Sequence, residues 1–416
     1  MGLLLLVFEL SKFERRAIMA DLKIFTENIE PEALEQIQTL LDQPAFSDCK
    51  VRIMPDVHAG AGCVIGFTAD LGDKVIPNIV GVDIGCGMRV VCLGPIDIDF
   101  EKLDTAIRKR VPCGRDVHEG RIVKFPDIQD LRCYRELKDT RRFERSIGTL
   151  GGGNHFIEID VDPINDNKFL VIHTGSRNMG KQVADYYQNL AIELMEGKGE
   201  LYAKQERLIA EYKAQGRKNE IQAAIKELRR TYKPNPLNIP RELCYLTGKY
   251  REDYLHDMEI CQRFAVENRK QIATAIMDEM DWKDGPFFET IHNYIEFETN
   301  MVRKGAISAK FGEELLIPIN MRDGCILGVG LGNEDWNCSA PHGAGRIMSR
   351  RKAREMVSMD EYKKSMEGIY TTSVDESTVD EAPMVYKPIE EIVKNIRDTV
   401  CIRTIIKPIY NFKASE

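Results

Sequence analysis

The sequence has 416 residues, of which 43% are hydrophobic and 30% are charged, and its formal net charge is −8. This composition supplies enough apolar side chains for a substantial core and excludes a chain that is disordered throughout. The acidic total also argues against a protein coated by nucleic acid over its whole surface, because phosphate binding depends on clustered lysine and arginine.

The cysteines and the N-terminus bear on the cellular setting. Eleven cysteines are scattered along the chain without a Cys-x-x-Cys pair, which is typical of a reduced, cytoplasmic protein. The apolar opening 3–8 is too short to span a bilayer, so we expect no membrane association. We expect residues 1–18 to be an N-terminal extension outside the folded core.

Three early regions combine apolar runs with polar turns. Between Val51 and Leu93, apolar runs alternate with Gly, Pro and Asp, which is typical of buried strands joined by tight turns. The glycine-rich turn 148–153 leads into the apolar segment 154–159, and the apolar run 169–172 leads into 173–176. We expect these regions to build a functional site.

The middle of the chain is predicted to be helical. The segment 181–232 is long and charged, with Ile221, Ile225 and Leu228 at helical spacing. Prolines at 234–240 interrupt it, and a second helical stretch is predicted at about 252–280.

Short strands are predicted to resume at 302–332. The segment 339–346 is then expected to open an arginine-rich helix. A last strand is expected at 401–412, ending beside Lys413, which would need a specific partner to have a function so close to the C-terminus.

Four of the seven histidines lie in turn-like, polar or glycine-rich surroundings. A single histidine in such a place is more often structural than a metal ligand. Four of them, together with Asp83 and Cys86 on the turn 81–87, favour a metal site, because glycines let the backbone approach an ion. These ligand types suit zinc at least as well as manganese, so the residues alone leave the metal open. The four histidines are His155, His173, His292 and His342.

Two glycine-rich turns, 151–153 and 343–345, could present backbone N–H groups to a phosphate. The second is expected at a helix N-terminus, where the helix dipole would assist. Neither is a GxxxxGK[ST] loop, and glycines more often mark ordinary turns. A histidine beside such a turn can attack a nucleotide α-phosphate while a metal neutralises charge. The residues therefore indicate a metal-dependent phosphoryl-transfer site.

At these positions the sequence resembles the RtcB RNA ligase family. The similarity runs from about Met54 to Lys413 and rests on six motifs in the family's order. The motifs are Met54-Pro55-Asp56-Val57-His58, Gly81-Val82-Asp83-Ile84-Gly85-Cys86-Gly87-Met88, the run from Gly148 to Glu158, His173-Thr174-Gly175-Ser176-Arg177, Arg303-Lys304-Gly305-Ala306 and His342-Gly343-Ala344-Gly345-Arg346.

The resemblance implies an α+β fold in which residues 19–416 form one catalytic domain, with a deep central metal and nucleotide site and a helical insertion at about 181–280. It implies two Mn²⁺ ions bridged by Cys86, with Asp83 and His155 completing one site and His173 and His292 the other. By the same resemblance, His342 is the nucleophile that takes guanylate from GTP.

The implied activity is RNA joining, in RNA repair or tRNA splicing. The guanylate would pass from His342 to an RNA 3′-phosphate, and the 5′-hydroxyl of a second RNA end would then displace GMP. A 2′,3′-cyclic phosphate would first be opened at the same site. Whether an archease-type activator is needed stays open.

The motifs also imply a set of guanylate contacts, with Arg346 expected to contact phosphate or RNA. The implied contacts are Asn154, His155, Phe156, Ile157, Glu158, His292, Asn293, Pro318, Ile319, Asn320, Met321, Cys325, His342, Gly343, Ala344, Gly345 and Lys413.

One segment departs from the family pattern. Relatives show Pro-Gly-Ser-Met-Gly and a second serine where this chain has the run from Pro318 to Cys325. Two glycines and two serines are thereby replaced by bulkier or different side chains. This departure motivates a second interpretation, a metal-dependent phosphatase or cyclic phosphodiesterase without efficient guanylylation. Asp56 and His58 either orient ligands or have ordinary core roles.

Overall fold

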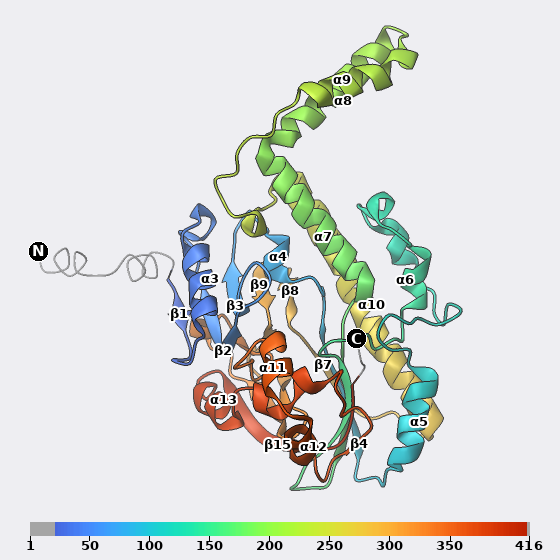
Figure 1. Ribbon diagram of the computed structural model, residues 1–416, viewed down its shortest axis with the longest axis vertical. Helices are drawn as coiled ribbons and strands as arrows, with labels where there is room; N and C mark the ends of the chain where they lie inside the picture. The colour runs from blue at the N-terminus through green and yellow to red at the C-terminus, as the bar shows by residue number, and fades with distance from the viewer. Residues whose placement is uncertain (1–20, 414–416) are drawn as a thin grey trace, which may run out of the picture.

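The computed structural model describes residues 21–413 and has a mixed α+β fold, as predicted (Figure 1). The expected N-terminal extension at 1–18 lies outside these residues. Two main sheets and a short strand pair lie at the centre, and helices cover them from outside. No described helix combines the length and apolar character needed to cross a membrane.

The larger sheet has eight strands and curls toward a barrel. Its order is β11-β12-β15-β5-β6-β4-β7, with β14 beside β15, and the two outer strands β11 and β7 contact each other. The strands are β4 (Gly87–Gly94), β5 (Phe156–Val161), β6 (Lys168–Thr174), β7 (Phe287–Ile291), β11 (Glu314–Asn320), β12 (Gly324–Gly330), β14 (Tyr370–Thr371) and β15 (Val400–Lys413).

The smaller sheet has five strands in the order β1-β2-β3-β9-β8, and β10 pairs with β13 beside it. These strands are β1 (Lys23–Ile24), β2 (Arg52–His58), β3 (Ile65–Asp70), β8 (Asn293–Glu296), β9 (Met301–Lys304), β10 (Ala306–Ser308) and β13 (Ser339–Pro341).

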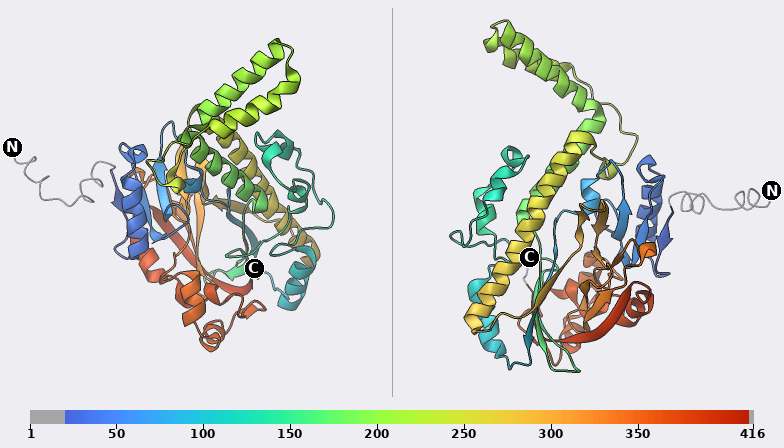
Figure 2. Two further views of the ribbon diagram at one scale, coloured as in Figure 1. Left: turned by 45° about the horizontal axis from the view of Figure 1, so that its top comes forward. Right: turned by 180° about the vertical axis from the view of Figure 1, so that it is seen from behind.

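Helices surround both sheets, and the longest, α10, lies along the back of the larger one (Figure 2). The helices are α3 (Pro31–Leu41), α4 (Pro77–Val80), α5 (Phe100–Arg110), α6 (Arg141–Arg145), α7 (Arg177–Glu193), α8 (Gly199–Ala214), α9 (Ile221–Thr231), α10 (Gly248–Met280), α11 (Arg350–Met356), α12 (Met359–Ser365) and α13 (Ile389–Asn395).

Alternation along β5 explains how the near-barrel is filled. Successive side chains of a strand point to opposite faces. Ile157 and Ile159 pack outward in one core cluster with Ile272 and Ile276 of α10. Phe156 instead packs inward, in the cluster that contains Val171 and Leu316. The barrel interior is therefore largely apolar, and any polar group on this inner face of β5 must find a partner there.

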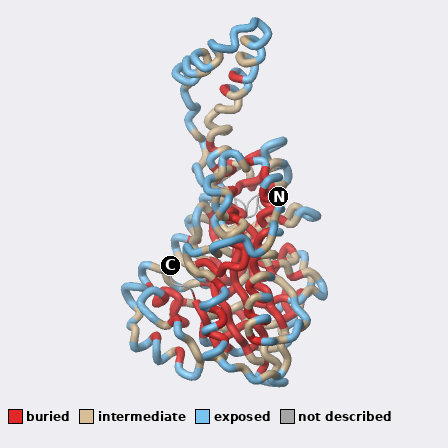
Figure 3. Tube along the Cα trace, turned by 90° about the vertical axis from the view of Figure 1, so that its right-hand side faces the viewer, coloured by how far each residue is buried: buried red, intermediate tan, exposed pale blue. Residues whose placement is uncertain are grey.

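The helical predictions for the middle of the chain are confirmed. Helices α7 and α10 bury apolar faces and belong to the core, with Tyr187, Tyr254 and Phe264 among their buried residues. Helices α8 and α9 instead form a hairpin that stands out from the body and is mostly exposed (Figure 3).

The expectation of a helix beginning beside His342 is wrong. Residues 342–345 form a bend, Arg346 bridges to Tyr386 as an isolated β-bridge, and α11 begins only at Arg350. Ser349 is the N-cap, accepting a hydrogen bond from the Lys352 N–H. The helix dipole of α11 therefore does not act at His342.

Candidate functional site

The ends of three adjacent strands bring the predicted metal ligands together. Cys86 immediately precedes β4, whose Met88 is paired with His173 of β6, and His292 immediately follows β7. The His292 N–H donates to the Cys86 carbonyl at 3.0 Å. This close pairing requires Gly87, because a Cβ there would collide with the carbonyl oxygen of Thr290.

The structure assembles these side chains into two groups that share one thiol. The ligand atoms within each group lie within 4.8 Å of one another. Cys86 Sγ is 3.3 Å from His173 Nε2 and 3.6 Å from His155 Nε2. His155 Nε2 is also 3.1 Å from Asp83 Oδ2. The groups are Asp83, Cys86 and His155, and Cys86, His173 and His292.

Backbone carbonyls orient two of the three imidazoles. Nδ1 of His155 lies 2.9 Å from the Leu150 carbonyl, and Nδ1 of His173 lies 3.1 Å from the Asn154 carbonyl. A carbonyl only accepts hydrogen bonds, so each Nδ1 carries the proton and each Nε2 presents a lone pair toward Cys86. His292 is buried and its Nδ1 has no hydrogen-bond partner.

The burial of this centre fits a divalent cation. Burial raises the pKa of the Cys86 thiol, and nearby Asp83 raises it further. Burial likewise lowers the pKa of His173 and of His292, so both imidazoles stay neutral. Neutral imidazoles are metal ligands, and a bound cation would stabilise the thiolate that burial otherwise disfavours. The donor set and the unpartnered His292 nitrogen both fit metal binding.

Helix α10 holds the loops that carry these ligands. The buried Arg269 guanidinium donates to the carbonyls of Gly85 and Thr174, each at 2.9 Å, and pairs with Glu289 at 2.8 Å. Asp83 approaches closely because the neighbouring Gly175 has no side chain, and a Cβ there would collide with the Asp83 carboxylate. The ligand loops are thus fixed from behind by buried hydrogen bonds.

His342 lies beside this centre and is oriented by a buried aspartate. Its ring centroid is 4.8 Å from that of His292. Asp56 Oδ2 lies 2.6 Å from His342 Nδ1 and also accepts from the backbone N–H of His342 and of Gly343, at 3.1 and 3.2 Å. Asp56 is fully buried. The carboxylate therefore holds the proton on Nδ1 and leaves Nε2 free to act as a nucleophile.

A cavity of about 570 Å³ opens beside His342 and His173. It is large enough for a nucleotide-sized ligand. The predicted metal ligand His173 and the predicted phosphate or RNA contact Arg346 line it. Many of the predicted guanylate contacts line it as well: Asn154, Phe156, Glu158, Pro318, Ile319, Asn320, Met321, His342, Gly343, Ala344, Gly345 and Lys413.

Five predicted contacts do not line the cavity. Two of them, His155 and His292, belong to the two ligand groups that share Cys86, and the other three place their side chains elsewhere. Ile157 faces outward toward α10. The Asn293 amide donates to the Asp83 carbonyl and accepts from the Gly305 N–H. Cys325 is buried below the cavity, with its Sγ 3.9 Å from Glu158 Oε1. Their side chains therefore support the site from outside the cavity.

A buried glutamate at the far wall of the cavity gives Lys413 its partner. Lys413 Nζ lies 2.6 Å from Glu381, and Arg346 lies 3.1 Å from the same carboxylate. Burial alone would raise the pKa of Glu381, but Lys413, Arg350 and Arg346 outweigh it and hold the pKa at about 2. Glu381 was not predicted from the sequence, because it lies in a short 3₁₀ helix, Val379–Glu381, that no motif marks.

A second acidic group lies on the inner face of β5, below the cavity. Glu158 and Asp160 are two residues apart on one strand, so both point into the apolar barrel, where they lie near Cys325. Asn411 donates to Glu158 at 2.5 Å, but neither oxygen of Asp160 has a hydrogen-bond partner. Burial raises the pKa of both carboxyl groups, and Asp160 raises that of Glu158 further. The pair therefore retains a proton to higher pH than free carboxyl groups do.

Taken together, the near-barrel, the paired Cys/His/Asp groups and the adjacent His–Asp pair fit a candidate metal site of the kind used for phosphoryl or nucleotidyl transfer. Comparison with known proteins agrees with this class. The family model of the tRNA-splicing ligase RtcB matches residues 36–136 and 126–414. The chain belongs to the RtcB family, which confirms the resemblance seen in the motifs.

Individual relatives match over most of their length. RNA-splicing ligase RtcB1 of Escherichia coli strain ATCC 25922 is 30% identical, over 92% of this chain and 97% of its own. RNA-splicing ligase RtcB of Escherichia coli K12 is 29% identical over the same shares. The tRNA-splicing ligase RtcB of Pyrobaculum aerophilum is 28% identical over 82% of each chain.

The buried Glu158–Asp160 pair predicts a specific pH dependence of stability. A carboxyl group with a raised pKa in the folded state stabilises the fold at low pH, and this contribution is lost as pH rises through the folded pKa. Replacing Asp160 with Asn should therefore raise the free energy of unfolding relative to the unmodified chain, and increasingly so as pH rises from about 4 to about 7. Urea unfolding across this range measures the effect.

Asp116→Asn, at an exposed position, controls for the loss of one carboxylate. If the difference in free energy of unfolding between Asp160→Asn and the unmodified chain stays constant with pH, the Glu158–Asp160 pair does not retain a proton as described.

Proposed function

We propose that this protein is a GTP- and Mn²⁺-dependent RNA ligase that joins an RNA 3′-phosphate, or a 2′,3′-cyclic phosphate, to a 5′-hydroxyl end. The single observation that supports it most is the arrangement around Cys86. Two ligand groups share this thiol, and His342, with its Nδ1 held by Asp56, lies directly beside the second group.

The metals implied by the family would be held by the two groups. Cys86 would bridge them, with Asp83 and His155 on one side and His173 and His292 on the other. When bound, two divalent cations neutralise charge that builds up on phosphate oxygens during transfer.

His342 supplies the nucleophile in the first step. Its unprotonated Nε2 attacks the α-phosphate of GTP, a P–N bond forms, and the bond to pyrophosphate breaks. The Asp56 carboxylate stabilises the positive charge that develops on the imidazole, because it already accepts the Nδ1 proton at 2.6 Å. The cavity beside His342 would hold the guanosine, with Glu158 and Lys413 among its polar lining residues.

Two further transfers complete the reaction. An oxygen of the RNA 3′-phosphate attacks the guanylate phosphorus, and the P–N bond to His342 breaks. The 5′-hydroxyl then attacks the activated 3′-phosphate, loses its proton, and GMP leaves. For a cyclic end, water would first open the 2′,3′-cyclic phosphate.

One observation favours the alternative of a metal-dependent phosphatase or cyclic phosphodiesterase. The Asn320 side chain accepts from the backbone N–H groups of Arg322 and Asp323 and donates to the Asp323 carboxylate. It is therefore engaged within its own turn, where relatives are expected to offer serine hydroxyls. A chain that holds metals but binds guanosine poorly would hydrolyse phosphate ends without forming a guanylate.

The ligase proposal predicts a covalent guanylate on His342. The purified protein incubated with manganese and α-³²P-GTP should retain label after denaturation, whereas α-³²P-ATP should give little. His342→Ala should abolish the label, and His256→Ala, on a partly exposed histidine of α10, should retain it. No label from either nucleotide, in protein shown to carry its metals, would support the phosphatase alternative.

The shared thiol predicts how metal content responds to substitution. Cys86→Ala removes a ligand from both groups at once, so both ions should be lost when the purified variant is analysed by inductively coupled plasma mass spectrometry. Cys401→Ala changes an exposed cysteine and should keep the full metal content. Retention of two ions by Cys86→Ala would rule out a bridging thiolate.

A further inference from the structure

The hairpin of α8 and α9 is built as an arm, defined here as residues 198–233. Its helix α8 has 16 residues, which corresponds to a length of about 24 Å. Gly197, with a φ of +88°, separates the arm from α7. The base is anchored at two acidic residues that precede the arm. Tyr232, Asn235 and Arg241 bond to Glu196, and Lys198 and Tyr202 bond to Glu193.

The arm contributes little to the hydrophobic core. No residue of α9 is buried, and α8 buries only Leu201 and Gln205. The apolar side chains of α9, such as Ile225 and Leu228, are half-buried against the neighbouring helix. Isolated helices of this length are marginal in water. The arm therefore adds little to the stability of the rest of the protein, and another role must account for it.

The charge of the arm is opposite to that of the whole protein. It contains ten lysines and arginines and five glutamates, a net charge of +5 in a chain whose total is −8. Helix α9 places Lys226, Arg229 and Arg230 three and four residues apart, on one side of the helix, and Lys233 follows two residues after the helix ends. All four are exposed.

We call these four residues the basic stripe, and most of the stripe is available for a ligand. Arg230 pairs with Glu227 on the surface, and Arg229 donates to the Gln205 amide. Among the described residues, Lys226 and Lys233 contact no carboxylate. Exposed ion pairs are weak, so a phosphate can compete for Arg230 as well.

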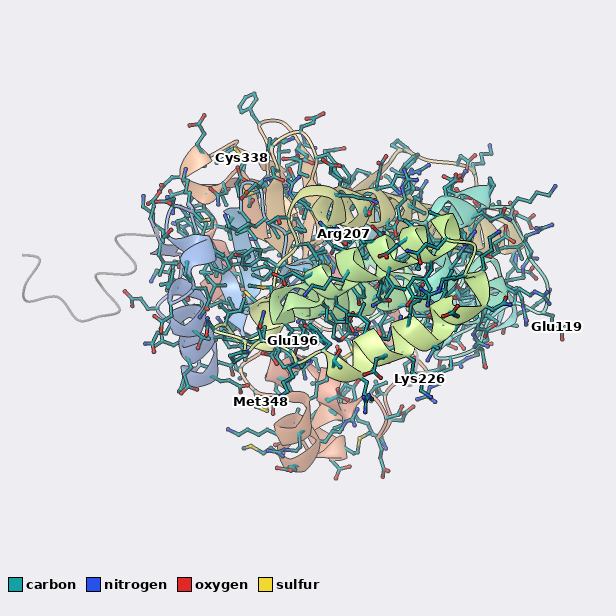
Figure 4. The ribbon with its side chains drawn as sticks, turned by 90° about the horizontal axis from the view of Figure 1, so that it is seen from above. Glu119, Glu196, Arg207, Lys226, Cys338 and Met348 are labelled. Atoms are coloured by element: carbon teal, nitrogen blue, oxygen red, sulfur yellow. The ribbon has the colours of Figure 1, made fainter. Side chains whose placement is uncertain are left out.

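Lys226 lies on the same side of the molecule as Met348, one of the residues that line the cavity. Figure 4 shows Lys226 of α9 and Met348 toward the lower side of the view. Arg207 lies above them, on α8, the other helix of the arm. An RNA bound in the cavity that extended along this side of the protein would pass toward α9 rather than α8.

We propose that the arm binds the sugar–phosphate backbone of the RNA substrate, at a distance from the ends that are joined. This inference rests on the proposed function for its substrate class. Clustered cations without an apolar centre match a phosphate backbone, which is bound through charge and released counterions. A protein partner would be expected to contact large apolar side chains. None of the exposed large hydrophobic residues of the described chain lies in the arm.

The test neutralises the stripe and varies the length of the RNA. The triple variant Lys226→Gln, Arg230→Gln and Lys233→Gln removes three charges while keeping good helix formers. The matched control, Lys102→Gln, Lys109→Gln and Arg403→Gln, removes three exposed charges from α5 and β15, away from the arm. Each protein is titrated with a folded RNA of transfer-RNA size and with a short single-stranded oligonucleotide that carries a 3′-phosphate, at several salt concentrations.

The arm variant should bind the folded RNA about tenfold or more weakly at low salt. Its plot of log Kd against log salt concentration should be shallower by up to about 3, since each lost phosphate contact removes about 0.9. Binding of the short oligonucleotide and labelling by GTP should not change. The control variant should bind the folded RNA like the unmodified protein.

Unchanged binding of the folded RNA by the arm variant would overturn the inference, as would an equal loss in the control variant or an equal loss with the short oligonucleotide. The guanylate assay tests the proposed function separately from the arm. If no guanylate forms but the arm variant still loses the folded RNA selectively, the arm inference stands and the ligase mechanism falls. If the guanylate forms and folded RNA binds independently of the arm, only the arm inference falls.

Discussion

The backbone pairing of β4 between β6 and β7 is the constraint on which the site depends. This pairing fixes Cys86, His173 and His292 at one end of the larger sheet through backbone hydrogen bonds alone, without a bound metal. It requires Gly87, where a side chain would collide with β7, and Gly175, where a side chain would collide with Asp83. A thiol at this position can contact ligands from both sides, which is why one cysteine can serve two metal positions.

The proposed mechanism also needs a nucleophile, and the candidate, His342, comes from the other half of the fold. Asp56 lies on β2 of the smaller sheet, and His342 follows β13 of the short strand pair. Their 2.6 Å contact fixes the protonated nitrogen of His342 and leaves the other free. The site therefore combines metal-binding groups from the larger sheet with an oriented imidazole from outside it. Neither half alone has the parts needed for nucleotidyl transfer.

The candidate metal ligands could be predicted from the sequence because several of them lie in short glycine-rich motifs with unusual composition. His155, His173 and Cys86 each carry such a signal, and the structure brings them together. The role of Asp56 remained open because its partner, His342, is 286 residues away along the chain. The expected helix at His342 was wrong because Ser349 offers a better N-cap than the glycine-rich bend before it.

Other features carry no local signal at all. Glu381 meets Lys413 and Arg346 only through the packing of the short 3₁₀ helix Val379–Glu381 near the end of β15. The partnerless Asp160 depends on the curl of the larger sheet, which places the inner face of β5 in an apolar interior. In the sequence, the basic stripe of α9 cannot be distinguished from the charged face of an ordinary solvent-exposed helix. Only the structure shows that it lies on a projecting arm.

The most direct test of the proposed activity follows the phosphate at the RNA end. An RNA whose 3′-phosphate carries ³²P is incubated with a 5′-hydroxyl RNA, GTP and manganese, and the products are then treated with phosphatase. The proposed ligase should place the label in a longer RNA, in an internal position that phosphatase cannot remove. Release of the label as inorganic phosphate before the phosphatase is added, without a joined product, would contradict ligation and favour the phosphatase alternative.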